Sequence, residues 1–184
     1  DQNGAWAVYQ ELHAAPTGIH TANSNLAYGM LPGNKTTQAD AIRAYCQALL
    51  KSKHPTWVTI PPPLRRRDMT EPRPCCRLLK ALYGHPESGA HWEKHLTEAI
   101  LRCGGIPILN LPSFFWIKPL AVMLTVYVDD LLCSGPIGNH EKFWKMLTDK
   151  NIGGISIDDP EPLDRFLGRK HVVLQSTPKK NKIS

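Results

Sequence analysis

The chain has 184 residues, of which 42% are hydrophobic, and its 22 lysines and arginines outnumber its 16 acidic residues, giving a net charge of +6 and a pI near 9.1. This length suits one ordinary domain with a hydrophobic core, or a piece of a larger one. No apolar run approaches the roughly 20 residues that a membrane-spanning helix needs, and no signal peptide is visible, so we expect an intracellular protein without a membrane partner.

The positive charge predicts attraction to polyanions. Basic residues cluster at 65–67 and again at 179–182, and a solvated basic loop remains the alternative interpretation of each cluster. Five cysteines show no C-x-x-C spacing, which indicates reduced thiols rather than a disulfide framework: Cys46, Cys75, Cys76, Cys103 and Cys133.

Patterns in the first half predict a mixture of strands and helices. They favour a strand at 5–9, a short helix at 22–30 and a turn at 31–34. Asp40 then ends a strand or begins a helix that runs to about residue 50. Two proline-rich stretches, around the arginine run, predict a loop that cannot hold regular structure.

The second half continues the alternation. The apolar spacing of Trp92, Leu96 and Ile100 predicts an amphipathic helix over 86–103. Further elements are predicted as a strand at 114–117, a long strand into an acidic hairpin, a helix at 141–147 packed by Phe143, Trp144 and Leu147, and a hairpin near 163–174. The order indicates an α/β (α+β) domain.

Two histidines lie four residues apart on the first of these helices and so share one face. A zinc-protease helix needs glutamate directly after the first histidine, as general base. Trp92 follows His91 instead, and Glu93 comes one residue later, before His95. We therefore interpret this face as a partly solvated helix surface.

Two adjacent carboxylates, Asp129 and Asp130, lie between two apolar runs within 121–133. Burying neighbouring anions is costly unless a positive charge accompanies them. The apolar runs predict a β-hairpin with the acids at its tip. Hard cations such as Mg²⁺ take oxygen ligands and share them with phosphates, so the tip is a candidate phosphoryl-transfer site. An ordinary acidic turn is the alternative.

A third carboxylate, Asp40, lies far upstream in Asp40-x-x-x-Ala44-Tyr45. Together with Tyr127-Val128-Asp129-Asp130, this segment resembles the two catalytic motifs of reverse transcriptases, in the branch of copia-type retrotransposons. Three further blocks resemble that family in the expected order, and with the two motifs they span residues 40 to 168: residues 56–61, residues 78–84 with Trp92, and residues 163–168.

The resemblance implies a polymerase palm-like sheet backed by helices, with incomplete fingers. It divides the chain into 1–35, partial fingers or an upstream segment, then 36–175, the palm-like domain, and 176–184, a basic mobile tail. The basic strands that contact the triphosphate in relatives have no counterpart in the first 35 residues.

The implied activity is RNA-directed DNA synthesis within a polyprotein. Two Mg²⁺ ions, or Mn²⁺, typically about 3.5–4 Å apart, are expected on Asp40, Asp129 and Asp130, with Asp129 the principal ligand. Because side chains alternate along a strand, only one of the two adjacent acids can face Asp40 unless the turn twists. The expected partners are an RNA or DNA template with primer, dNTPs and other polyprotein segments, in a cytoplasmic virus-like particle or the nucleus.

The resemblance also implies substrate-binding residues. Tyr45 matches the position that excludes a 2′-hydroxyl, although a core aromatic is the alternative. Tyr127 matches the position that meets the primer or template, and Val128 completes this predicted set. One departure is Glu87, which stands where relatives carry glutamine, and an acid there repels phosphates unless it points away.

Two hypotheses therefore follow from the sequence. The first is an active RNA-directed DNA polymerase domain, and the second is a catalytically inactive retrotransposon-derived remnant that binds nucleic acid. A metal-dependent hydrolase is a third and weaker candidate, since no histidine stands beside the acids as a general base.

Overall fold

The computed structural model describes residues 17–172. The predicted strand at 5–9 and the predicted tail at 176–184 lie outside these residues. No helix within the described range is long and apolar enough to cross a membrane.

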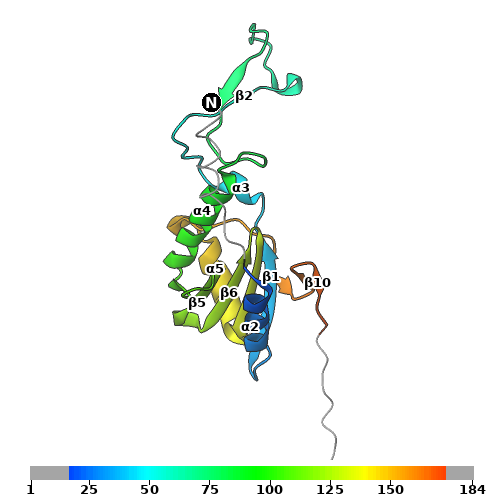
Figure 1. Ribbon diagram of the computed structural model, residues 1–184, viewed down its shortest axis with the longest axis vertical. Coiled ribbons are helices and arrows are strands. Elements are labelled where there is room, and N and C mark those ends of the chain that lie inside the picture. The colour runs from blue at the N-terminus through cyan, green and yellow to red at the C-terminus, as the bar shows by residue number, and fades with distance from the viewer. Residues whose placement is uncertain (1–16, 173–184) are drawn as a thin grey trace, which may run out of the picture.

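A six-stranded sheet forms the centre of the molecule, and every pairing in it is antiparallel (Figure 1). The strands lie in the order β4-β5-β6-β7-β1-β8. Their bounds are β1 Asn34–Asp40, β4 Gly105–Pro107, β5 Phe114–Ile117, β6 Val122–Tyr127, β7 Asp130–Pro136 and β8 Glu161–Pro162.

Two further two-stranded ladders share no strand pairing with this sheet. One pairs β2 (Trp57–Thr59) with β3 (Cys75–Arg77), and the other pairs β9 (Arg165–Phe166) with β10 (Arg169–Lys170). Short 3-10 turns occur at Pro62–Leu64, Lys118–Leu120, Ile137–Asn139 and Lys150–Ile152.

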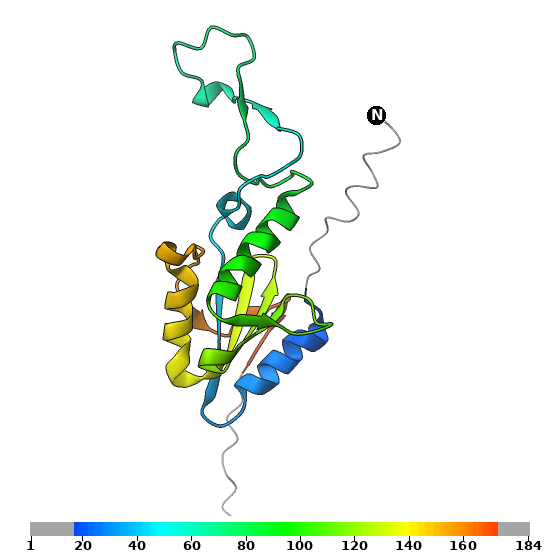
Figure 2. The ribbon, with the colours of Figure 1, turned by 90° about the vertical axis from the view of Figure 1, so that its left-hand side faces the viewer.

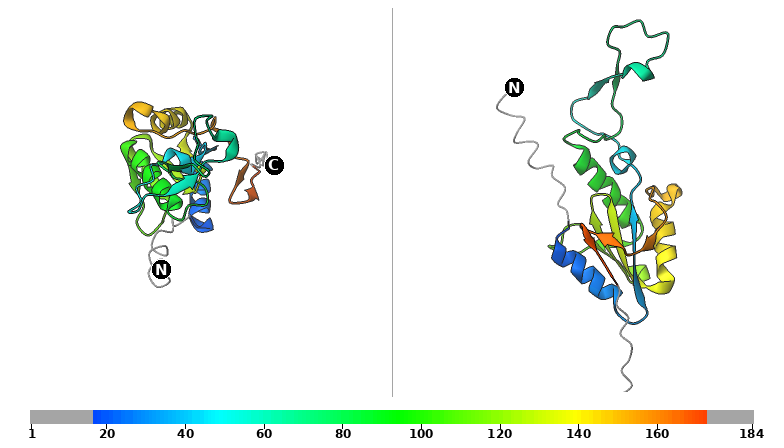
Figure 3. Two further views of the ribbon diagram at one scale, coloured as in Figure 1. Left: turned by 90° about the horizontal axis from the view of Figure 1, so that it is seen from above. Right: turned by 90° about the vertical axis from the view of Figure 1, so that its right-hand side faces the viewer.

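Helices cover both faces of the sheet (Figures 2 and 3). On one face lies α2 (Ile19–Gly29), and on the other lie α4 (Ser88–Arg102) and α5 (His140–Thr148). The four-residue α3 (Ala44–Gln47) follows β1 and contacts α4. Although α2 falls within the predicted segment 1–35, it packs on β6 and β7.

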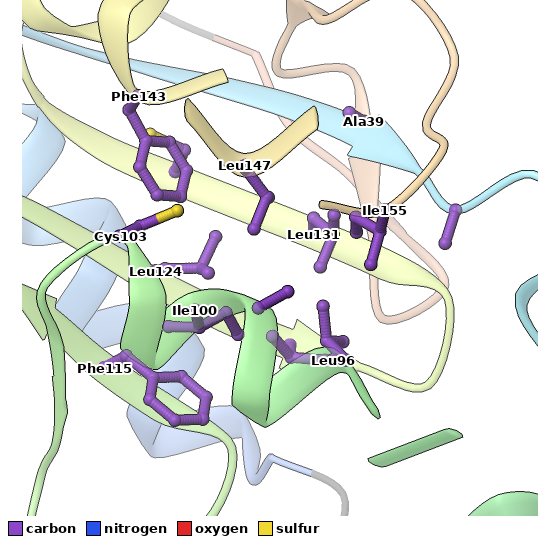
Figure 4. Packing of buried hydrophobic residues seen from close by; sticks show 14 of the residues in the cluster. Ala39, Leu96, Ile100, Cys103, Phe115, Leu124, Leu131, Phe143, Leu147 and Ile155 are labelled. Atoms are coloured by element: carbon purple, nitrogen blue, oxygen red, sulfur yellow. The ribbon is translucent and has the colours of Figure 1, made fainter. Parts of the chain in front are cut away.

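The alternation of side chains along β7 explains why helices pack on both faces of the sheet. Leu131 packs with α4 and α5, whereas the next residue, Leu132, packs with α2 and Phe166 on the opposite face. Figure 4 shows Leu96 and Ile100 of α4 near Leu131 in the larger cluster. Each such side chain contributes about 1.5–3 kcal/mol when fully buried.

A buried polar network fixes α5 on the sheet. The indole N–H of Trp144 donates to Thr37 Oγ1 at 3.0 Å, and Thr37 Oγ1 lies 2.9 Å from His140 Nδ1. His140 Nε2 lies 3.0 Å from the carbonyl of Gly135. Burial lowers the pKa of His140, so the imidazole is neutral, and Nε2–H donates to Gly135 while Nδ1 accepts from Thr37.

The α+β class predicted from the sequence is confirmed, as are the helices at α2, α4 and α5 and the strand β5. The acidic hairpin is confirmed as β6 and β7, and the closing hairpin as β9 and β10. The predicted loop around the arginine run is correct in large part, but β2 and β3 flank it and Pro62–Leu64 forms a 3-10 turn.

Asp40 ends strand β1, which confirms one of the two predicted alternatives. The helix predicted to run to about residue 50 is wrong in length, because only Ala44–Gln47 is helical. Long-range backbone hydrogen bonds compete with the helix at both ends. Ile42 N–H donates to Ser156 O at 3.0 Å, and Leu50 N–H donates to Leu79 O at 3.0 Å.

Candidate functional site

The acidic hairpin closes with a two-residue loop. Tyr127 at the end of β6 pairs with Asp130 at the start of β7, so Val128 and Asp129 form the loop. Val128 has a φ of 58°, and positive φ at the first loop position alone is typical of a type II′ turn. A β-branched residue in this left-handed region is strained by about 1–3 kcal/mol.

Asp40 and Asp130 lie directly opposite one another. Asp40 is the last residue of β1, Asp130 is the first of β7, and their Cα atoms are register partners. Side chains of such a pair leave the same face of the sheet. Leu132 and Phe166 pack on that face, so the two carboxyls lie on the side covered by α2.

The two carboxyls interact by a hydrogen bond. Burial raises the pKa of Asp130 to about 6, and the charges of Asp40 and Asp129 add to the shift, as does the hydrogen bond to Asp40. Burial also raises the pKa of Asp40, followed by the charge of Asp158, while the hydrogen bond with Asp130 lowers it. Asp130 is therefore the donor when this pair shares a proton.

Asp129 lies beside the pair within the loop. Its carbonyl accepts the backbone N–H of Ala41 at 2.8 Å, which ties the loop to the residue after Asp40. Its charge raises the pKa of both Asp40 and Asp130. Strand alternation predicted that one acid of the hairpin faces Asp40, and that acid is Asp130. The predicted role of Asp129 as principal metal ligand stays a prediction.

Sequence reasoning missed two further acids near Asp40. Asp158 Oδ1 accepts the backbone N–H of Asp40 at 2.7 Å, and the N–H of Asp158 donates to Asp40 O at 3.0 Å. Glu161 Oε1 accepts from Gln38 Nε2 at 2.8 Å. The acidic pair before Pro160 was the available signal, but 118 residues separate Asp158 from Asp40.

The donor chemistry around Asp40 suits a hard cation, because it consists of carboxylate oxygens. Among residues 17–172, no group of three or more His, Cys, Asp or Glu side chains is arranged to hold a metal ion. The predicted metal ligands thus comprise one pair in direct contact, Asp40 and Asp130, with Asp129 beside it. A cation or a proton relieves the repulsion within that pair.

An aromatic pair lies near enough to the hairpin tip for Asp129 to influence it. Tyr45 on α3 contacts Tyr83, with ring centroids 4.6 Å apart and planes tilted by 48°. Burial and then the charge of Asp129 raise the pKa of Tyr83, which places its hydroxyl within the field of the hairpin tip. Tyr83 lies within the block 78–84 that resembles the family, but no pattern in the sequence predicts its contact with Tyr45.

The predicted substrate-binding residues Tyr45, Tyr127 and Val128 line one cavity of about 120 Å³. Its opposite wall comes from α4, and there Trp92 is 2% exposed. The indole N–H of Trp92 donates to the carbonyl of Val128 at 2.7 Å, which anchors the strained loop residue to α4. The cavity is lined by Tyr45, Gly89, Trp92, Glu93, Leu96, Thr97, Ser113, Phe115, Val126, Tyr127 and Val128.

Glu87, the residue that departs from the family pattern, is engaged by its neighbours. Its carboxylate accepts a hydrogen bond from the hydroxyl of Ser52 and lies 3.7 Å from His91 Nε2. These contacts hold the carboxylate of Glu87 beside the first turn of α4.

Comparison with known proteins gives two relatives in Arabidopsis thaliana. The chain is 31% identical over 134 residues to the retrovirus-related Pol polyprotein from transposon RE1, and 29% identical over 133 residues to that from transposon RE2. Each match covers 71% of this chain and 9% of the polyprotein. No family model matches. The chain is thus similar to a short segment of retrotransposon Pol polyproteins.

The first prediction concerns Asp130. Because its pKa is raised, its ionisation opposes folding, and the stability of the wild type relative to Asp130→Asn falls as pH rises from about 4 through about 6. After allowance for solvent screening of this half-buried group, the free energy of unfolding of Asp130→Asn, relative to the wild type, should be about 1 kcal/mol higher above pH 6 than near pH 4. Urea unfolding at pH 4.5 and pH 7.5 in EDTA measures this, and equal differences at the two pH values contradict it.

The second prediction concerns Trp92. Trp92→Phe keeps the aromatic ring but leaves the Val128 carbonyl without its donor, which costs about 1–3 kcal/mol. We expect faster hydrogen exchange of the Ala41 amide, which bonds the loop at Asp129. The matched control is Trp116→Phe at a partly exposed tryptophan on β5. Unchanged exchange at Ala41 in Trp92→Phe contradicts the anchoring role.

Proposed function

We propose that this chain is the reverse transcriptase domain of a copia-type retrotransposon polyprotein and acts as an RNA-directed DNA polymerase. The observation that carries the proposal is the meeting of Asp40 and Asp130 at two strand ends, beside Asp129 at the tip of a tight hairpin. These residues belong to the two motifs that resemble the family's catalytic motifs. Similarity to the Pol polyproteins supports the same origin.

Asp40, Asp129 and Asp130 are the proposed ligands of two Mg²⁺ or Mn²⁺ ions. When bound, these ions supply positive charge that stabilises the triphosphate and lowers the pKa of the primer 3′-hydroxyl. The chain's own contribution is to hold the carboxylates in place. The β1–β7 ladder fixes Asp40 opposite Asp130, and the two backbone contacts with Asp158 fix the end of β1.

Binding of a cation by Asp40 and Asp130 would be accompanied by loss of the proton that they share. With a pKa of about 6, Asp130 is mostly ionised at neutral pH, and the proton that it shares with Asp40 is lost as pH rises. Two facing carboxylates then require a cation to offset their repulsion. The arrangement therefore favours metal binding above pH 6 and opposes it below.

The aromatic pair supplies the proposed sugar selection. Tyr45 would lie against the deoxyribose and exclude a 2′-hydroxyl, and its ring contacts that of Tyr83. Tyr127 and Val128, on the shared cavity, would meet the primer end. The partners proposed are a primed RNA or DNA template, dNTPs and other segments of the polyprotein, in a cytoplasmic virus-like particle or the nucleus.

The antiparallel sheet with helices on both faces supports the palm-like part of the proposal. In this proposal, residues 36–175 form the palm-like domain, residues 1–35 the upstream segment and residues 176–184 a basic tail. The second candidate is a catalytically inactive remnant that binds nucleic acid through its basic surface. Glu87 favours the loss of catalysis in that candidate, because an acid at this position opposes phosphates.

Primer extension on an RNA template, with Mg²⁺ and dNTPs, tests the proposal. We expect the chain, or a longer chain extended upstream to complete the fingers, to extend the primer. Asp129→Asn and Asp40→Asn should each lower the rate by about 100-fold or more, because each removes charge stabilisation of the reacting groups. Glu141→Gln, at an exposed acid on α5, is the matched control.

Extension that survives both aspartate substitutions contradicts the proposed site. Silence from every chain, with circular dichroism showing that each is folded, contradicts the polymerase and favours the inactive remnant. If no chain extends the primer, Glu87→Gln tests whether Glu87 is the reason. Activity gained by this variant identifies Glu87 as the inactivating residue.

A further inference from the structure

The segment 51–80, here called the arm, projects away from the sheet and its helices (Figures 1 and 2). Its core is the antiparallel pair β2 and β3. At its base, Leu49 bridges to Lys80, and the N–H of Ala81 donates to Ala48 O at 3.0 Å. The arm is thus a hairpin joined to the body by backbone pairing.

The arm carries the whole net charge of the chain. It contains eight lysines and arginines and two acidic residues, a net charge of +6, which equals the net charge of all 184 residues. The rest of the sequence is therefore electrically balanced. Such concentration of one sign on a projecting element favours a polyanionic partner.

Most of these cations form no ion pair within the described part of the chain. Within the described residues, the arm's one ion pair is Arg66 with Asp68, at 3.0 Å and largely exposed. Arg65 stabilises the arm itself, because its Nε–H donates to the backbone carbonyl of Ile60 at 3.0 Å. Six exposed cations of the arm form no ion pair with any residue of 17–172: Lys51, Lys53, Arg67, Arg73, Arg77 and Lys80.

An exposed aromatic side chain lies opposite one of these cations. Trp57 on β2 is 62% exposed, an unusual state for the largest apolar side chain. Its register partner is Arg77 on β3, so the indole and the guanidinium leave the same face of the hairpin. Nucleobases stack on exposed aromatic rings, and phosphates pair with the neighbouring guanidinium groups.

We propose that the arm is a binding surface for single-stranded nucleic acid, with a base stacked on Trp57 and phosphates held by Arg67, Arg73 and Arg77. A single strand is favoured over a duplex because a duplex hides its base faces from the indole. The proposal rests on the proposed function for the identity of the strand as a template, but the binding itself requires neither metal nor catalysis.

Fluorescence anisotropy with a labelled oligouridylate tests the arm, in EDTA so that no synthesis takes place. The arm variant combines Arg67→Gln, Arg73→Gln and Arg77→Gln. Its charge-matched control combines Lys118→Gln, Lys142→Gln and Lys170→Gln, three exposed lysines elsewhere on the molecule. Each phosphate contact contributes about 0.7 to the slope of log affinity against log salt, so the arm variant should lose about 2 from that slope, and the control should keep it.

The aromatic contact has its own variants. Trp57→Ala should weaken binding by about 10-fold, and Trp57→Phe should keep most of the affinity, because any aromatic face can stack. Urea unfolding of each variant checks that the body remains folded. A duplex of equal length should bind more weakly than the single strand.

Equal salt slopes for the arm and control variants overturn the proposal, as does an unchanged affinity in Trp57→Ala. Tighter binding of the duplex, or equal binding of polyglutamate, overturns the assignment to a single strand. Arm-dependent binding with silent primer extension supports the arm and contradicts the polymerase. Active extension with arm-independent binding contradicts the arm alone.

Discussion

The antiparallel ladder between β1 and β7 joins residues that are 90 to 102 positions apart in the sequence, from Asp40 paired with Asp130 to Asn34 paired with Pro136. Its register is fixed by packing on both faces, because Leu131 belongs to the cluster under α4 and α5 while Leu132 belongs to the cluster under α2. A slip by one residue would exchange these faces. The same packing that holds the core thus holds two carboxylates opposite one another.

Two features at the end of this ladder lower the stability of the fold. Val128 has a left-handed φ where glycine or asparagine is the ordinary choice, and Asp130 is half-buried against other acids. The surrounding structure offsets these costs, through the Trp92 indole on the loop and the backbone contacts of Asp158 with Asp40. Strain and unfavourable charge gathered at one loop, with dedicated support, are typical of functional sites.

Much of this could be predicted from the sequence where a local pattern carries the signal. The spacing of Trp92, Leu96 and Ile100 marked α4, and two apolar runs around the acids marked the hairpin. The helix after Asp40 was overestimated because its competitors, Ser156 and Leu79, lie far along the chain. Asp158 and Tyr83 were missed for the same reason, since their roles depend on tertiary contacts that leave no periodic trace.

The central proposal is that Asp40, Asp129 and Asp130 form a site for divalent cations, and paramagnetic broadening by Mn²⁺ tests it most directly. In amide NMR spectra at neutral pH, the account predicts that substoichiometric Mn²⁺ broadens residues around 40, 129, 130 and 158 first. Excess Mg²⁺ should reverse this broadening, and Asp40→Asn should abolish it. Broadening centred elsewhere, or unchanged by Asp40→Asn, would contradict a metal site at the hairpin tip.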